Sequence, residues 1–157
     1  MNPFLVAATC AACLLSASAT AQLAGPGLAW SGSSGNHASS YLPSCQNLPV
    51  TAVPSETVTL TVWGDMLSPF GLFAAASGSQ CIQIPGFGGG VVLDLPVVPV
   101  TAGLLTMTSP CLSCPPGHEQ LQFVVPPGLP PGTSVALQAV ALGAGNLSFT
   151  VAITGSI

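Results

Sequence analysis

The chain has 157 residues, 49% of them hydrophobic, which is enough for one domain with a hydrophobic core. It contains no lysine or arginine and only four acidic residues, so its formal net charge is −4. Without Lys or Arg to contact phosphate, electrostatically driven binding to nucleic acid or anionic lipid is not expected. The stability of the fold must rely on apolar burial, hydrogen bonds and disulfides.

Residues 1–21 have the features of a secretory signal peptide. An apolar segment over residues 4–15 precedes Ala19-Thr-Ala21, which fits a small-x-small cleavage site. The segment is short and rich in Ala, Ser and Thr for a helix that must cross a ~30 Å hydrocarbon core. We therefore expect a mature chain that begins near Gln22, has no membrane span, and is secreted or held at the cell surface.

Residues 22–44 are rich in Gly, Ser and Ala and show no sustained periodicity. Such a composition favours irregular structure. We predict an irregular arm, or one weakly marked strand, laid over a domain that comprises residues 45–157.

The clearest strand in that domain covers residues 57–63. Val58, Leu60 and Val62 alternate there with three threonines, which is the period of two expected of a half-buried strand. Residues 70–76 and 81–84 flank a Ser-Gly-Ser-Gln loop and predict a hairpin. Prolines limit residues 97–100 to an edge strand or a connection. The remaining strand candidates in the middle of the chain are residues 91–95, 104–108 and 119–125.

The C-terminal residues 133–154 predict a hairpin around a Gly-Ala-Gly-Asn loop. Its predicted core residues are those of one face: Val135, Leu137, Phe149, Val151 and Ile153. The opposite face of the first strand is also apolar, so we expect this strand to be covered by the arm or by a partner.

Short strands at close intervals, with no credible helix after the signal peptide, indicate an antiparallel sandwich or barrel. We predict an all-β fold, an antiparallel β-sandwich of about seven to eight short strands.

Three local features of residues 45–157 are shared with a recurring domain. They are Pro43-Ser-Cys45, an apolar strand that leads to Cys81, and an ending in which a Pro-Gly connector precedes Leu137-Gln-Ala139 and Asn146-Leu-Ser148. In these features the chain resembles a small secreted domain of uncharacterised extracellular proteins from planctomycete bacteria, although Cys111-Leu-Ser-Cys114 is an insertion relative to that group. The resemblance implies a secreted bacterial β-sandwich and supplies no substrate or active site.

Four cysteines remain after the signal peptide, and in an exported chain an even number predicts disulfides. Three pairings exist; we favour Cys111 with Cys114, two residues apart in a Pro-flanked turn, and Cys45 with Cys81. Metal or redox chemistry on Cys111, Cys114 and His118 is the alternative. It lacks a fourth zinc ligand and a helix to activate the thiols. We predict no metal and no cofactor.

No catalytic residue is predicted, because Gly32-Ser-Ser-Gly35 lacks the spacing of a nucleophile elbow and the acids are scattered. The sequence favours a secreted, non-enzymatic structural or adhesive module of the bacterial cell exterior, with a glycan or an envelope protein as partner. The alternative is a carbohydrate-binding module that uses exposed aromatics, for which Trp30, Tyr41 and Trp63 are the candidates, although such side chains also serve as core. The sequence leaves the oligomeric state open.

Overall fold

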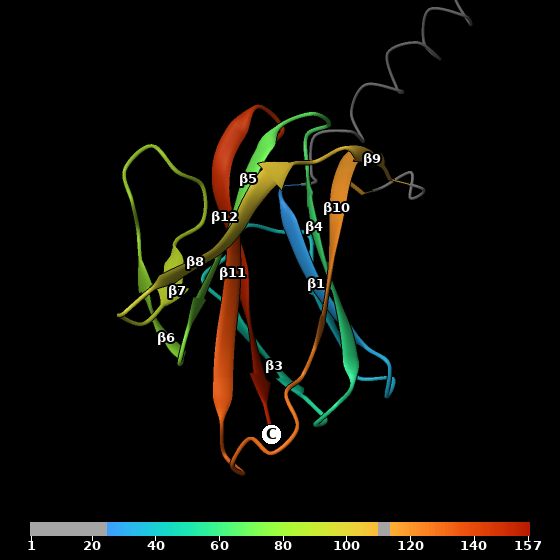
Figure 1. Cartoon of the computed structure of the whole chain (residues 1–157). Coiled ribbons are helices and arrows are strands. Elements are labelled where there is room, and N and C mark those ends of the chain that lie inside the picture. Colours follow the sequence, from blue (N-terminus) through green and yellow to red (C-terminus); the bar gives the residue numbers. More distant parts are fainter. Residues whose placement is uncertain (1–24, 110–113) are drawn as a thin grey trace, which may run out of the picture.

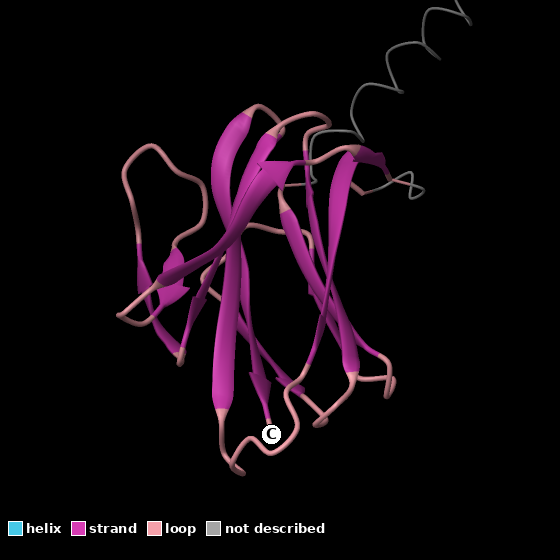
Figure 2. Cartoon of the chain, viewed as in Figure 1, coloured by secondary structure: helices cyan, strands magenta, loops and turns pink. Residues whose placement is uncertain are grey.

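The computed structural model describes residues 25–109 and 114–157, so the predicted signal peptide lies outside the described residues. Twelve strands and no helix form the regular structure of these ranges (Figure 2). The all-β prediction is therefore confirmed, although the described residues form twelve strands rather than the predicted seven to eight. In the same ranges, no helix is long and apolar enough to cross a membrane.

Two five-stranded sheets, A and B, pack face to face, and a two-stranded sheet of β6 and β7, which we call the ribbon, lies beside sheet B (Figure 1). Sheet A has the order β2-β1-β4-β10-β9, and sheet B has the order β3-β12-β11-β5-β8. Neighbouring strands are antiparallel except β3 and β12, which are parallel. The strands are β1 (Gly27–Gly32), β2 (His37–Ser40), β3 (Asn47–Thr51), β4 (Thr57–Gly64), β5 (Pro69–Ala75), β6 (Gly78–Ile82), β7 (Val91–Leu93), β8 (Val98–Leu104), β9 (Met107–Thr108), β10 (Gly117–Val124), β11 (Ser134–Gly143) and β12 (Asn146–Ser156).

The main core lies between the two sheets. The inward side chains of β4 are fully buried there, as the alternation of residues 57–63 predicts: Val58, Leu60 and Val62. They belong to one cluster with Leu137 and Ile153 of sheet B. The sandwich thus forms by burial of one apolar face of each sheet.

The prediction of an irregular arm over residues 22–44 is wrong for most of the described part of that segment. Residues 27–40 form β1 and β2, and β1 pairs with both β2 and β4 as an interior strand of sheet A. Leu28 and Trp30 face the core, while the small Ala29 is buried on the opposite side. A strand buried on both faces does not alternate between apolar and polar residues, so its sequence carried no period of two.

The predicted hairpin between residues 70–76 and 81–84 is also wrong. Both segments contain strands, but β5 pairs with β11 and β8, whereas β6 pairs with β7. Phe70 and Leu72 of β5 are buried in the main core. Long-range pairing thus places β5 inside sheet B, and β6 belongs to a separate two-stranded sheet with β7.

The C-terminal hairpin forms as predicted, but two of its predicted core residues lie elsewhere. Ala144 and Gly145 join β11 to β12 with positive φ angles, as a two-residue hairpin turn requires. A β-bulge between Gln138 and Val140 then shifts the register, so that Phe149 pairs with Val140 on the outer face of sheet B. Val135 is 44% exposed.

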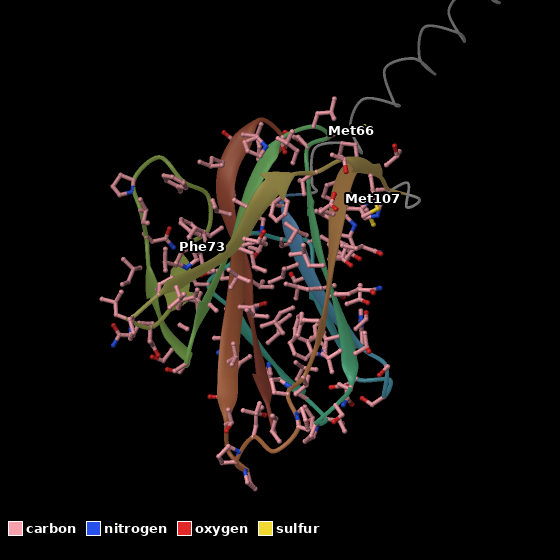
Figure 3. The ribbon with its side chains drawn as sticks, in the orientation of Figure 1. Met66, Phe73 and Met107 are labelled. Atoms are coloured by element: carbon pink, nitrogen blue, oxygen red, sulfur yellow. A yellow bond between two sulfur atoms is a disulfide. The ribbon has the colours of Figure 1, made fainter. Side chains whose placement is uncertain are left out.

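The outer face of sheet B is covered by the ribbon rather than by the arm or a partner. A second cluster of buried apolar residues, including Val92 and Leu93 of β7 and Ala136 of β11, fills the space between them. Phe73, labelled in Figure 3, packs against this cluster from β5. The ribbon therefore buries the second apolar face that the sequence of β11 shows.

The side chain of Gln138 connects the ribbon to sheet B. It is 1% exposed; its Oε1 accepts a hydrogen bond from the Val92 N–H (2.9 Å), and its Nε2 donates to the carbonyls of Gly90 and Thr150 (2.8 Å each). Both the oxygen and the nitrogen of this buried amide are thus hydrogen-bonded to backbone groups, two of them in or next to β7 and one in β12. The Cys45–Cys81 disulfide adds a covalent link between β6 and the segment before β3.

The acidic side chains fix turns. Asp65 accepts hydrogen bonds from the N–H groups of Ala144 and Gly145 at 3.0 Å each, which joins the β4–β5 turn to the hairpin turn. The buried Glu56 accepts from the Ser34 hydroxyl (2.5 Å) and the Val53 N–H (2.7 Å), which joins the turns before β2 and β4. Burial raises the pKa of Glu56, but these bonds outweigh burial and leave the pKa below its ordinary value of 4.5.

The role of Gln138 predicts a large effect of Gln138→Leu, which keeps side-chain volume but leaves the Val92 N–H and two carbonyls unpaired. We expect a loss of about 2 to 4 kcal/mol in the free energy of unfolding, measured by urea denaturation. Gln120→Leu, at an exposed position of β10, is the matched control and should change it by less than ~0.5 kcal/mol. Equal stability of the two variants would contradict this role.

The lowered pKa of Glu56 predicts a pH-dependent stability. Because the pKa is lower in the folded than in the unfolded chain, the ionised carboxylate stabilises the fold above the unfolded pKa, and this contribution is lost as the pH falls through the folded pKa. Melting temperatures between pH 6 and pH 3 should therefore fall less steeply for Glu56→Gln than for the wild type, and Ser34→Ala should show an intermediate slope. A wild-type slope in Glu56→Gln would refute the assignment.

Candidate functional site

Tyr41 and Trp63 form an aromatic pair at one end of sheet A. Their ring centroids lie 4.9 Å apart with an interplanar angle of 66°, and both side chains are half-buried. Gly27 of β1, which pairs with Trp63, makes room for this contact: a Cβ there would lie 2.9 Å from Cδ1 of Tyr41. The structure thus brings together two of the three aromatic residues proposed from the sequence.

The pair lies on an uncharged, polar sheet face. Strand alternation and register place on the same side of sheet A the side chains that we call the outer face: Ser31, His37, Ser39, Thr59, Thr61, Trp63, Gln120 and Gln122. The Ser31 hydroxyl lies 3.0 Å from Nδ1 of His37, and the Ser39 hydroxyl lies 3.2 Å from its Nε2. The outer face therefore offers hydroxyl and amide groups, with no carboxylate among its members.

Trp30 does not join this pair. It is 3% exposed on the inner side of sheet A and packs edge-to-face on Phe123, with centroids 5.5 Å apart and an interplanar angle of 76°. Its indole Nε1 is buried and has no hydrogen-bond partner within the described ranges. Trp30 is thus a core residue with an unsatisfied donor.

Trp30 also lines a cavity of about 440 Å³ between the sheets, which we call the apolar cleft. The cleft opens where β9 ends: β9 pairs only with Gly117 and His118, so the rest of β10 has no described neighbour on that side. Residues of β10, of β11 and of the connector between them belong to the lining; Figure 1 shows how this connector runs from one sheet to the other. The sequence does not predict the cleft, because the cleft depends on how far β9 pairs along β10. Val135, which the sequence predicts as a core residue, is exposed because it lines the cleft.

The cysteine predictions are confirmed in one half. Cys45 and Cys81 form a disulfide that closes a loop with a sequence separation of 36 residues and contributes about 3 to 4 kcal/mol on the chain-entropy estimate. Cys111 lies outside the described residues, so its pairing with Cys114, which is disulfide-bonded, stays a prediction. Where side chains are described, no group of three His, Cys, Asp or Glu residues is placed to hold a metal ion.

The potential catalytic groups are dispersed. His37 contacts two serines, and His118 is buried with its Nδ1 unpaired in the described structure. Asp94 accepts from the hydroxyls of Ser77 and Ser79, and Glu119 accepts from that of Thr106. Within residues 25–109 and 114–157, neither histidine has a hydrogen-bonded carboxylate, which a Ser-His-acid arrangement would need.

Comparison with known proteins assigns no family. No family model and no curated protein matches the sequence. Among solved structures, a chitin-binding domain from Burkholderia pseudomallei is similar over 71% of this chain and 56% of that chain, with 16% sequence identity and a TM-score of 0.34. Overlap at this level establishes neither a shared fold family nor a shared ligand.

Proposed function

We propose that the protein is an exported, non-catalytic module that binds uncharged polysaccharide on the outer face of sheet A. The observation that carries the proposal is the half-exposed Tyr41–Trp63 pair on a face of hydroxyl and amide groups. A sugar ring presents C–H groups on one side and hydroxyls around its edge. An aromatic ring can pack on the former, while Gln and Ser side chains donate to and accept from the latter.

The charge of the chain supports an uncharged ligand. With a net charge of −4 and no Lys or Arg, the protein has no group that would attract an acidic polysaccharide. The four carboxylates already accept hydrogen bonds from groups of the chain itself, and none belongs to the outer face. Recognition would therefore rest on packing and on neutral hydrogen bonds.

The Cys45–Cys81 disulfide supports export, because such bonds persist in oxidising compartments. The signal peptide predicted from residues 1–21 points the same way. The dispersed histidines and acids support a binding rather than a catalytic role. Attachment to a polysaccharide would account for the adhesive role that the sequence favours. The other kind of partner expected from the sequence is an envelope protein.

The proposal is tested by co-sedimentation with insoluble cellulose, chitin and β-1,3-glucan, with soluble alginate as the acidic competitor. We expect the wild type to bind at least one uncharged polysaccharide, alginate not to compete, and Trp63→Ala to weaken binding at least tenfold. Tyr41→Phe, which keeps the ring, should retain most of the affinity.

Phe87→Ala is the matched control, because Phe87 also belongs to an aromatic pair, with Phe149 at 5.3 Å, but is not a member of the outer face and precedes the Gly88 bridge to β12. This variant should bind as the wild type does, and thermal melting should show that all variants are folded. The proposal fails if the wild type binds none of the three polysaccharides or if Trp63→Ala binds as tightly as Phe87→Ala.

A further inference from the structure

The apolar cleft has the dimensions of a small-molecule site. Its volume of about 440 Å³ falls within the ~300 to 1,000 Å³ that such sites span. Its base consists of the buried Trp30, Leu60 and Leu72, which come from both sheets. The connector between β10 and β11 closes one end, and it is held there by hydrogen bonds from the Gly132 N–H to the Ile157 carbonyl (2.7 Å) and from the Ile157 N–H to the Thr133 carbonyl (3.0 Å).

The lining of the cleft favours an apolar occupant. No charged side chain belongs to it, and two of its few polar side chains are already engaged: the Thr133 hydroxyl donates to the Pro130 carbonyl and the Ser134 hydroxyl to the Ala76 carbonyl. Water bound deep in the cleft would find few of the two to four polar partners that an ordered water usually has. An aliphatic chain would instead contact apolar side chains on both walls.

The indole N–H of Trp30, a residue of the base, indicates that the occupant carries a hydrogen-bond acceptor. The indole N–H of Trp30 is a buried donor without a partner in the described ranges, and such a group is stabilised by any acceptor brought next to it. Phe123 also lines the cleft, packs against the Trp30 ring in a T-shaped arrangement and is 38% exposed. Because the N–H is buried, an oxygen atom reaches it only if a neighbouring side chain moves, and Phe123 is the exposed neighbour. The occupant should carry an oxygen acceptor.

The charge of the chain restricts that acceptor further. Because no Lys or Arg exists anywhere in the sequence, a carboxylate in the cleft would lose its hydration without gaining a counter-ion. We propose that the apolar cleft binds an uncharged single-chain amphiphile, a long-chain alcohol or ester, with its oxygen beside the indole N–H of Trp30. This site is separate from the outer face and does not depend on polysaccharide binding.

The test uses displacement of N-phenyl-1-naphthylamine, an uncharged dye that fluoresces in apolar sites, by 1-dodecanol and by dodecanoate at pH 8. We expect the wild type to bind the dye and 1-dodecanol to displace it, with dodecanoate at least tenfold weaker. Trp30→Phe, which keeps an aromatic ring but removes the N–H and part of the indole, should weaken 1-dodecanol severalfold more than it weakens the dye. Trp63→Ala should change neither, which separates this site from the polysaccharide face.

Two substitutions on β8 form a matched pair. Val100 is 53% exposed and lines the cleft, whereas Val98 is 56% exposed and lies outside its lining. Val100→Trp should fill the cleft and weaken the dye and 1-dodecanol at least tenfold; Val98→Trp should leave both unchanged, and thermal melting checks that both variants are folded.

Three results would overturn the proposal. The first is equal binding by Val100→Trp and Val98→Trp, and the second is dodecanoate binding as tightly as 1-dodecanol. The third is a difference in oligomeric state measured by light scattering, with a dimeric wild type and a monomeric Val100→Trp variant. The cleft would then be occupied by a second copy of the chain paired along the open edge of β10.

Discussion

The amide of Gln138 is the contact on which the layering of this molecule depends. Sheet B is apolar on both faces, and no helix of the described residues covers it. Its inner face is buried by sheet A. Its outer face is buried by the ribbon of β6 and β7, which forms no strand pairing with the sheet. The amide supplies hydrogen bonds between the ribbon and the sheet in place of such a pairing. The third layer is therefore held by this buried amide together with the apolar cluster beneath it and the Cys45–Cys81 disulfide.

The lack of Lys and Arg has the same structural consequence in several places. Carboxylates that would pair with cations in most proteins accept hydrogen bonds from N–H and hydroxyl groups of neighbouring turns. Asp65 in particular holds the hairpin turn between β11 and β12 from a turn about eighty residues earlier. The loops are thus fixed by neutral donors, and no carboxylate belongs to the outer face of sheet A.

Much of the fold is predictable from local patterns, and the exceptions have physical causes. Residues 57–63 alternate because β4 has one side on the core, and the C-terminal hairpin is recognisable from its loop and its flanking apolar segments. β1 was missed because it is buried on both sides. Phe149 was misplaced because a bulge of one residue exchanges the two faces of a strand. Gln138 stands within an apolar run of β11, and a lone amide there was the available sign of the ribbon.

The candidate sites were predictable to a lesser degree. Tyr41 and Trp63 were recognisable as aromatics in a chain with few of them, but only the register of β1 and β4 shows that they meet. The apolar cleft has no local signature at all. It lies beside the part of β10 that β9 does not pair with, and the extent of this pairing in the described residues is a property of the complete sheet.

The parallel pairing of β3 with β12 has a consequence for folding. Thr154 donates a hydrogen bond to Asn47 across 107 positions of sequence, and β12 lies between β3 and β11 in sheet B. Because β12 pairs with both, neither β3 nor β11 has all of its strand partners before β12 is available. Among the described strands β3 pairs with β12 alone, so a chain that emerges from its N-terminus must keep β3 unpaired until β12 is available, and contacts of such sequence separation form slowly.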